Sequence, residues 1–147
     1  MPTVETPIGA LSYRIADSGA LAEVWFGTVD TGGVRSAELE RQLADFFDRK
    51  LLAFDFPLEP KGTPFQMAVW TELIKIPFGE TRSYLQIAKA IGLPAATRAV
   101  GAANGANPIP LIIPCHRVIG SNGKLTGYGG GLEMKSKLLD FEQGSLF

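Results

Sequence analysis

The sequence of 147 residues contains only one cysteine and one histidine, and these are neighbours, Cys115 and His116. A single cysteine excludes an intramolecular disulfide and a second thiol that could resolve a mixed disulfide. A structural zinc site needs about four cysteine or histidine ligands, which this chain cannot supply. We therefore expect a protein with neither a bound metal nor a cofactor.

Long hydrophobic runs and targeting signals are also missing. No apolar run approaches the roughly 20 residues that a membrane-spanning helix needs. The first five residues, MPTVE, lack the basic and apolar regions of a signal peptide. These absences predict a cytoplasmic protein without a membrane partner. With 46% hydrophobic residues, a chain of this length can bury a core, as one domain or two small lobes.

The net charge of −1 hides an uneven distribution of charge along the chain. Residues 1–60 carry 5 basic and 10 acidic side chains, whereas residues 61–147 carry 9 basic and 5 acidic ones. This asymmetry is typical of an acidic lobe followed by a basic lobe that faces a polyanion such as DNA. Random scatter of charge over two ordinary lobes is the alternative.

Residues 1–60 predict a small α/β lobe. Two runs with strand character, residues 11–15 and 20–26, flank an Asp-Ser-Gly turn and predict a β-hairpin. Within residues 36–51, four apolar side chains recur at spacings of three and four and predict one amphipathic helix: Leu39, Leu43, Phe46 and Phe47. Prolines at positions 57 and 60 indicate the connection to the second lobe.

Residues 61–147 predict a mainly helical lobe. A helix is predicted to start at residue 63, where a capping threonine, a proline at the first helical position and a capping-box glutamine follow one another: Thr63, Pro64 and Gln66. Ser83 and Gln86 repeat the capping box and start a helix that runs through residue 91. Further helices are predicted over residues 95–103 and 132–142. The expected fold class is therefore mixed α/β of the α+β type, with a hairpin-and-helix lobe before a mainly helical one.

The helices at residues 83–91 and 95–103, joined by a tight turn at Gly92, match a helix-turn-helix. The second helix consists mostly of alanine and glycine, and Arg98 is its only long side chain. Such a helix can approach a DNA groove very closely. An ordinary helical hairpin inside a core explains the same pattern, and most helix arginines are solvated surface residues.

Pro108 and Pro110 precede the apolar residues 111–113 and predict an extended, buried segment that leads to Cys115. A thiol with a pKa of about 8.5 is only a few per cent ionised at neutral pH. His116 could accept its proton, and a carboxylate could fix the histidine tautomer. Two carboxylates on the last helix are candidates: Asp140 and Glu142.

The pair Cys115 and His116 is a weak signal by itself. A lone cysteine is most often inert core filler. Adjacent side chains on an extended segment also point to opposite faces.

The surrounding sequence is more specific. Pro114-Cys115-His116-Arg117-Val118 resembles the active-site signature of the O6-alkylguanine-DNA alkyltransferases, also called methylated-DNA–protein-cysteine methyltransferases. Other motifs follow in that family's order and spacing: Phe65-Gln66 with Val69-Trp70, residues 79–84, residues 98–101, Asn107-Pro108 and residues 128–132. The resemblance is strong over residues 60–143 and looser over residues 7–58.

The resemblance implies a set of catalytic roles. Cys115 is the nucleophile that accepts the alkyl group, and His116 takes its proton through a water molecule. Glu142 orients His116, and Asn107 braces the turn that holds the active-site segment. Tyr84 presses on the phosphate beside the lesion and helps to rotate the nucleotide out of the duplex.

A guanine pocket is also implied by the resemblance. The Tyr128 hydroxyl donates to N3 of the extruded base, the Val118 carbonyl faces the exocyclic amine, and the Gly129 amide faces O6. Pro110 and Gly130 suggest a pocket with room for groups larger than methyl.

The implied DNA contacts centre on Arg98, which occupies the space that the flipped base leaves in the stack. Further contacts are implied for residues of the helix-turn-helix and the signature: Ser83, Tyr84, Ala96, Thr97, Ala99 and Arg117. The implied partner is double-stranded DNA containing alkylated guanine, bound through the minor groove by a monomeric protein.

The expected function is repair of O6-alkylguanine, and of O4-alkylthymine, by base flipping and irreversible alkyl transfer to an internal cysteine. This is a stoichiometric methyltransferase, because no residue could hydrolyse the thioether and no second thiol could exchange it. Two other functions remain open. A helix-turn-helix lesion sensor would bind without transferring the alkyl group, and a Cys-His hydrolase or acyltransferase would turn over repeatedly.

Overall fold

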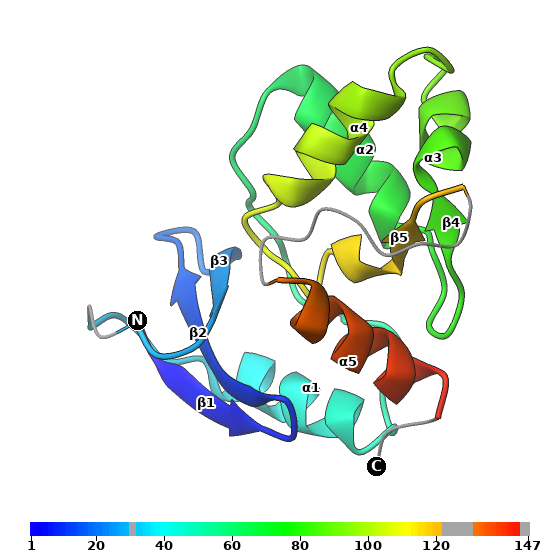
Figure 1. Ribbon diagram of the computed structural model, residues 1–147. Coiled ribbons are helices and arrows are strands. Elements are labelled where there is room, and N and C mark those ends of the chain that lie inside the picture. The colour runs from blue at the N-terminus through cyan, green and yellow to red at the C-terminus, as the bar shows by residue number, and fades with distance from the viewer. Residues whose placement is uncertain (30–31, 122–130, 145–147) are drawn as a thin grey trace. The chain divides into compact units, whose positions relative to one another are not determined.

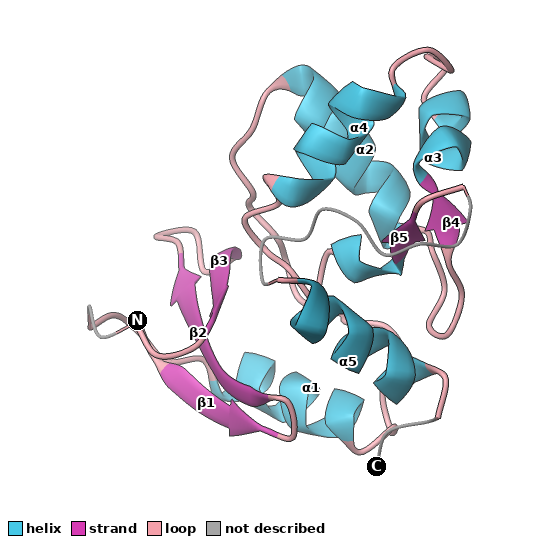
Figure 2. Ribbon diagram, viewed as in Figure 1, coloured by secondary structure: helices cyan, strands magenta, loops and turns pink. Residues whose placement is uncertain are grey.

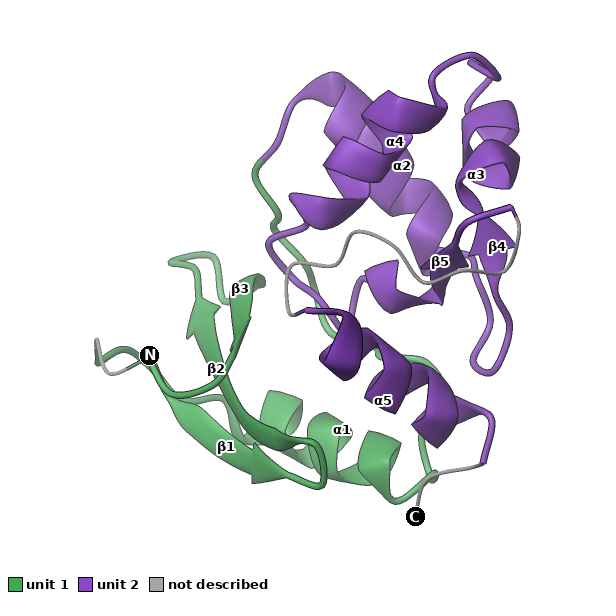
Figure 3. Ribbon diagram, in the orientation of Figure 1, with its two compact units in different colours: residues 1–61 green, residues 62–147 purple. Residues whose placement is uncertain are grey.

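A computed structural model describes residues 1–29, 32–121 and 131–144 of the chain. The chain divides into two compact units, residues 1–61 and 62–147, coloured separately in Figure 3. The division falls one residue after the boundary expected from the sequence. Figures 1 and 2 show the helices and strands of the two units.

Unit 1 contains a three-stranded antiparallel sheet in the order β1-β2-β3 and one helix. The predicted hairpin is confirmed: β2 (Gly9–Ile15) pairs with β3 (Leu21–Phe26), and a register shift lies at the end of β2, between Arg14 and Ile15. A third strand, β1 (Thr3–Thr6), pairs with β2 and was not predicted. Its four residues, TVET, are too few and too polar to show a clear strand pattern.

The helix of unit 1, α1 (Ala37–Phe47), begins where the Ser36 hydroxyl accepts a hydrogen bond from the Leu39 amide. Its predicted apolar stripe is buried, as expected for an amphipathic helix. The predicted end at residue 51 is wrong, because the helix stops at Phe47. Arg49 has φ of 59°, a left-handed conformation that cannot continue a right-handed helix.

Unit 2 contains four α-helices among the residues that the structure describes: α2 (Pro64–Ile74), α3 (Tyr84–Ala90), α4 (Thr97–Gly105) and α5 (Leu132–Glu142). Both predicted capping boxes are present, at the starts of α2 and α3. Helix α4 begins two residues later than predicted. Ala96 provides no side-chain cap, and its amide instead closes a turn onto the Leu93 carbonyl.

Helices α3 and α4 pack against each other and against α2, so the predicted pair of helices is present. The buried indole Nε1 of Trp70 donates to the Ala103 carbonyl at 2.8 Å, which ties α2 to α4. Two short strands, β4 (Arg82–Ser83) and β5 (Val118–Ile119), pair in parallel. No helix in the described part of the chain has the length and apolar character needed to cross a membrane.

The segment before Cys115 differs from the predicted extended chain. It folds back on itself: the Ile113 amide donates to the Ile109 carbonyl at 2.9 Å, and Leu111 has φ of 75°. A 3-10 turn, η1 (Cys115–Arg117), follows. The alternation of side chains along a strand therefore does not apply to Cys115 and His116.

Candidate active site

Cys115 is the first residue of η1, and 3% of its surface is exposed. Both of its backbone polar groups are bonded. The amide donates to the Ile113 carbonyl at 2.7 Å, and the carbonyl accepts from Asn104 Nδ2 at 3.2 Å. Because Asn104 belongs to α4, the helix with the small side chains directly fixes the backbone of the cysteine.

Asn107 holds the turn that precedes Cys115. Its Nδ2 donates to the Ile113 carbonyl at 2.8 Å, and its Oδ1 accepts from the Ile109 amide at 2.9 Å. One side chain thus joins the start and the end of the folded-back segment. The resemblance implied a brace at this position, and these two hydrogen bonds are the contacts that a brace would make.

His116 is fully buried, and its Nε2 lies 2.6 Å from Glu142 Oε2. Burial raises the pKa of Glu142, but hydrogen bonds and charge from His116 and Arg117 outweigh it and lower the pKa to about 2. Glu142 is therefore a carboxylate that accepts the Nε2 proton. The other candidate, Asp140, is exposed on α5.

The imidazole of His116 is neutral. Burial lowers its pKa, the hydrogen bond and charge of Glu142 oppose this shift, and the positive charges of Arg117 and Lys135 lower it further. With the proton on Nε2, Nδ1 carries a free lone pair. Within the described residues, Nδ1 is a buried atom without a hydrogen-bond partner. It can accept a proton directly or through a water molecule.

Arg117 lies inside unit 2, with 6% of its surface exposed. Its Nε and Nη2 donate to Glu142 Oε1 and Oε2, both at 2.8 Å, and its Nη1 donates to the Ile76 carbonyl at 2.7 Å. The DNA contact implied for Arg117 stays a prediction, and these three buried hydrogen bonds argue against it. Reaching a phosphate would break three buried hydrogen bonds and leave the Glu142 charge poorly compensated.

Glu142 receives one more hydrogen bond that the sequence did not suggest. The Gly79 amide donates to Glu142 Oε1 at 3.3 Å. Gly79 has φ of 81°, which a residue with a side chain rarely adopts. The glycine at this turn therefore presents its amide to the carboxylate that orients His116.

The exposed side of α4 carries Arg98 among small residues: Ala99, Ala102 and Gly105. Ala96 and Thr97, at its start, are half-buried, as is Ser83, whose hydroxyl caps α3. Tyr84 is 8% exposed, and a Cβ on Gly101 would lie 3.9 Å from its ring. Helices α3 and α4 are thus in close contact where the DNA-binding residues are expected.

The structure leaves part of the implied guanine pocket untested. Tyr128, Gly129 and Gly130 lie outside the described residues. Val118 lies opposite Arg82 in the β4–β5 pair, and Pro110 is half-buried.

Two buried residues near the cysteine escaped the sequence analysis, Asn104 and Lys135. Asn104 gave no signal in a run of small residues. Lys135 did give one, because it falls on the buried face of α5 with Leu138, Leu139 and Glu142, at positions i, i+3, i+4 and i+7. A charged residue on such a face points to a polar site within the core.

Residues 64–144 match the family model described as 6-O-methylguanine DNA methyltransferase, DNA binding domain. A curated methylated-DNA–protein-cysteine methyltransferase from Mycobacterium bovis is 58% identical over 151 residues, covering 96% of this chain and 90% of the relative. The chain belongs to the 6-O-methylguanine DNA methyltransferase family. A relative of the same name from Methanosarcina barkeri is 58% identical over 109 residues, covering 74% of this chain and 69% of the relative.

The methyltransferase fold extends over both units. The chain is similar to the crystal structure of Mycobacterium tuberculosis OGT in complex with DNA, with a TM-score of 0.88, 45% identity, and coverage of 98% of this chain and 92% of that one. The family and the mixed α/β fold class predicted from the sequence are confirmed. So is the class of activity, methyl transfer from O6-methylguanine in DNA to a protein cysteine.

Proposed function

We propose that this chain repairs O6-alkylguanine in double-stranded DNA by flipping the base and transferring its alkyl group irreversibly to Cys115. One observation carries the assignment of the acceptor: transfer to a protein cysteine requires a thiol, and Cys115 is the only one in the chain. Its position next to the buried His116–Glu142 pair supports the same assignment.

The chemistry begins with ionisation of the thiol. Cys115 gives its proton through a water molecule to His116 Nδ1, the unpartnered acceptor described above, and Glu142 stabilises the resulting imidazolium. The thiolate attacks the sp3 alkyl carbon, so an S–C bond forms as the C–O6 bond breaks. Guanine leaves with the electron pair and takes up a proton, and we assign the Tyr128 hydroxyl to ease the developing negative charge.

The product on Cys115 is a thioether. No other cysteine is present to exchange it. Each protein molecule therefore reacts once, which distinguishes this function from a hydrolase or acyltransferase built on the same Cys-His pair.

Base flipping is required because O6 of a paired guanine lies in the stack, where a thiol cannot approach the alkyl carbon in line. Flipping costs a few kcal/mol, and least for a base that pairs badly. We propose that α4 enters the minor groove, with Arg98 filling the vacated space and Tyr84 pressing on the adjacent phosphate. The exposure of Arg98 among small residues on α4 supports this arrangement.

The proposed substrates include O4-alkylthymine and alkyl groups larger than methyl, and the proposed active form is a monomer in the cytoplasm. Reaction with O6-methylguanine but none with O6-benzylguanine would remove the larger groups from this proposal.

The decisive experiment is intact mass spectrometry after incubation with an oligonucleotide containing O6-methylguanine. We expect a gain of one methyl group per protein, located on Cys115 by peptide mapping. Cys115→Ala should gain none and still bind the oligonucleotide. Binding without any transfer by the unaltered protein would indicate a lesion sensor, and more than one product per protein would indicate a hydrolase.

A further inference from the structure

Asn104 is a buried asparagine on α4 that uses only one of its two polar side-chain atoms within the described structure. The residue has 1% of its surface exposed. Its Nδ2 donates to the Cys115 carbonyl at 3.2 Å, whereas its Oδ1 has no hydrogen-bond partner among the described residues. Because a carbonyl only accepts hydrogen bonds, the amide nitrogen must face Cys115. The unpartnered atom is therefore the oxygen, which is an acceptor.

His116 contains a second atom of the same kind. Its Nδ1 and Asn104 Oδ1 are the two buried side-chain atoms without a hydrogen-bond partner in the described parts of the chain. Both are acceptors, because the His116 proton lies on Nε2, towards Glu142. Leaving an acceptor buried and unpaired costs about 1–3 kcal/mol. Two acceptors cannot satisfy each other, so the pair requires hydrogens from a third group.

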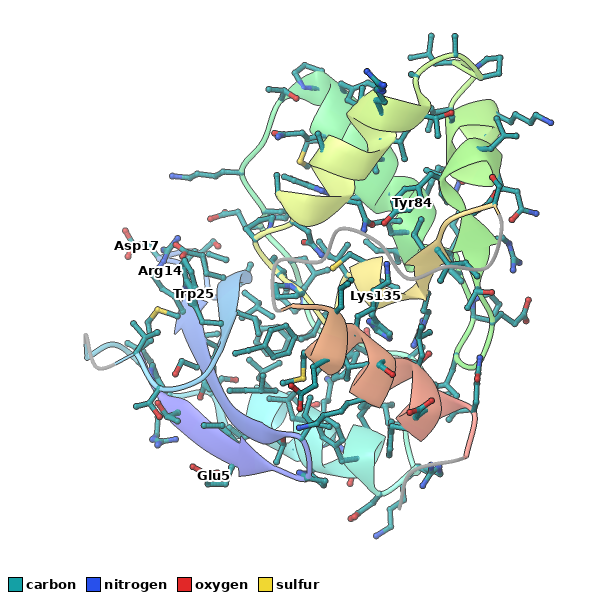
Figure 4. The ribbon with its side chains drawn as sticks, viewed as in Figure 1. Glu5, Arg14, Asp17, Trp25, Tyr84 and Lys135 are labelled. Carbon is teal, nitrogen blue, oxygen red and sulfur yellow. The ribbon has the colours of Figure 1, made fainter. Side chains whose placement is uncertain are left out.

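Both acceptors belong to residues that adjoin the backbone of Cys115. Asn104 Oδ1 shares a planar amide with the nitrogen that contacts the Cys115 carbonyl, and His116 is the next residue of η1. Figure 4 shows η1 between α4 and α5, the helices that carry Asn104 and Glu142. The unpartnered oxygen of α4 and the unpartnered nitrogen of η1 are therefore both features of the site that contains the thiol.

We propose that Asn104 is a positioning residue for alkyl transfer, and that its Oδ1 holds the water molecule that carries the Cys115 proton to His116 Nδ1. The inference rests on the proposed function, in which this relay ionises the thiol, and it adds the group that fixes the water in place. A water molecule has two hydrogens, one for each acceptor, and its oxygen accepts the thiol hydrogen. About three hydrogen bonds are usual for a buried water.

The proton transfer is balanced with these groups alone. The thiol proton moves to the water oxygen as a proton of the water moves to His116 Nδ1, which leaves a thiolate, a water molecule and an imidazolium. The hydrogen that faces Asn104 does not move. After the transfer, the imidazolium donates to the water oxygen, and the water donates to the thiolate and to Asn104. The same position of the water therefore serves both states, so the step requires little reorganisation.

The direct test is a crystal structure of the unaltered protein at a resolution that shows ordered water. We expect one water oxygen within about 3.2 Å of both Asn104 Oδ1 and His116 Nδ1, next to the Cys115 sulfur. A water bound to only one of the two acceptors, or to neither, would overturn the proposal. This measurement needs no variant, so it does not depend on how a substitution affects folding.

Asn104→Leu tests the function of the acceptor, because leucine has a similar shape and no polar side-chain atom. The rate of alkylation by iodoacetamide is measured at pH 7 and pH 10, and it reports Cys115 alone because the chain has no other thiol. We expect a loss of about tenfold at pH 7, the change in ionised fraction for one pKa unit. At pH 10, above the ordinary thiol pKa of about 8.5, hydroxide replaces the relay and the loss should shrink to less than about twofold.

Asn107→Leu is the matched control. Asn107 also donates its Nδ2 to a main-chain carbonyl of the segment before Cys115, but its Oδ1 already accepts from the Ile109 amide. This substitution disturbs the segment without removing a ligand of the water, so its effect on the rate should be similar at the two pH values. A similar loss at both pH values in Asn104→Leu would assign Asn104 only a structural role and overturn the proposal. An unchanged rate at pH 7 would do the same.

Failure of the proposed function would give a different result. If DNA containing O6-methylguanine transfers no methyl group to Cys115, the repair assignment fails. The position of the water and the iodoacetamide rates would still test whether Asn104 holds a proton relay between Cys115 and His116, because neither measurement uses DNA.

Discussion

Arg117 and Glu142 form a buried two-point ion pair, in which Arg117 Nε and Nη2 each donate to a different carboxylate oxygen at 2.8 Å. This geometry fixes the plane of the carboxylate as well as its charge. Glu142 Oε2 is thereby held towards His116 Nε2. Arg117 therefore stabilises the internal structure of the candidate site, whereas the resemblance implied that it contacts DNA.

Replacing Arg117 with glutamine should destabilise the protein by about 3–5 kcal/mol, because it leaves a buried carboxylate without its charge partner. Urea unfolding measures this loss. Arg117→Lys keeps the charge but loses the two-point geometry, so its free energy of unfolding should lie between those of the unaltered protein and Arg117→Gln. DNA affinity should depend on salt concentration equally in the unaltered protein and in both folded variants. A weaker dependence in Arg117→Gln would indicate that Arg117 contacts a DNA phosphate.

Replacing Arg98 with alanine should impair repair of duplex DNA far more than reaction with free O6-benzylguanine. The side chain is exposed on α4 and is proposed to occupy the stack only when a base has left it. Single-turnover rates on the two substrates measure the difference. Lys89→Ala, an exposed lysine near the end of α3, is a control that should preserve the ratio of the two rates. Equal losses on both substrates would argue against insertion of Arg98 into the stack.

Replacing Glu142 with glutamine should slow alkyl transfer by on the order of 10², the usual scale for loss of acid–base assistance. The amide is nearly the same size but carries no charge to fix the His116 tautomer or to stabilise an imidazolium. The loss should appear with free O6-benzylguanine as well as with duplex DNA, because it acts on the thiol chemistry. A defect confined to duplex DNA would place Glu142 in DNA binding.

The free energy of unfolding should fall in acid, because folding lowers the pKa of both Glu142 and His116. The pKa of Glu142 is about 2 in the folded protein and 4.5 ordinarily, so its contribution is complete above pH 4.5 and is lost as the pH falls towards 2. That difference corresponds to about 3 kcal/mol. Burial of neutral His116 lowers its pKa, so stability also decreases as the pH falls below 6.5.

Thermal unfolding between pH 3 and pH 7 measures this dependence. Glu142→Gln should be less stable at pH 7 and should lose less of its remaining stability on acidification. A dependence on pH as steep as that of the unaltered protein would contradict the role of Glu142.

Much of unit 2 was predictable because its signals are local. A threonine or serine followed three residues later by a glutamine satisfies the first amides of a helix with its own side chains, so Thr63 and Ser83 each start one. The buried stripe of α5 has the helical period. The hairpin of unit 1 was predicted from two runs of strand-forming residues around an Asp-Ser-Gly turn. The pattern of β1 was too short to detect.

The signature around Cys115 identified the family from the order of amino acids alone, and it named the cysteine that we propose as the acceptor. The sequence could not decide whether Asp140 or Glu142 meets His116, nor that Arg117 turns inward, nor that the Lys135 amine lies beside the Tyr84 hydroxyl. Those facts depend on contacts between residues far apart in the sequence, from 26 positions for His116 and Glu142 to 51 positions for Lys135 and Tyr84. Local periodicity determines which face of a helix is apolar, but only packing decides which buried charges meet.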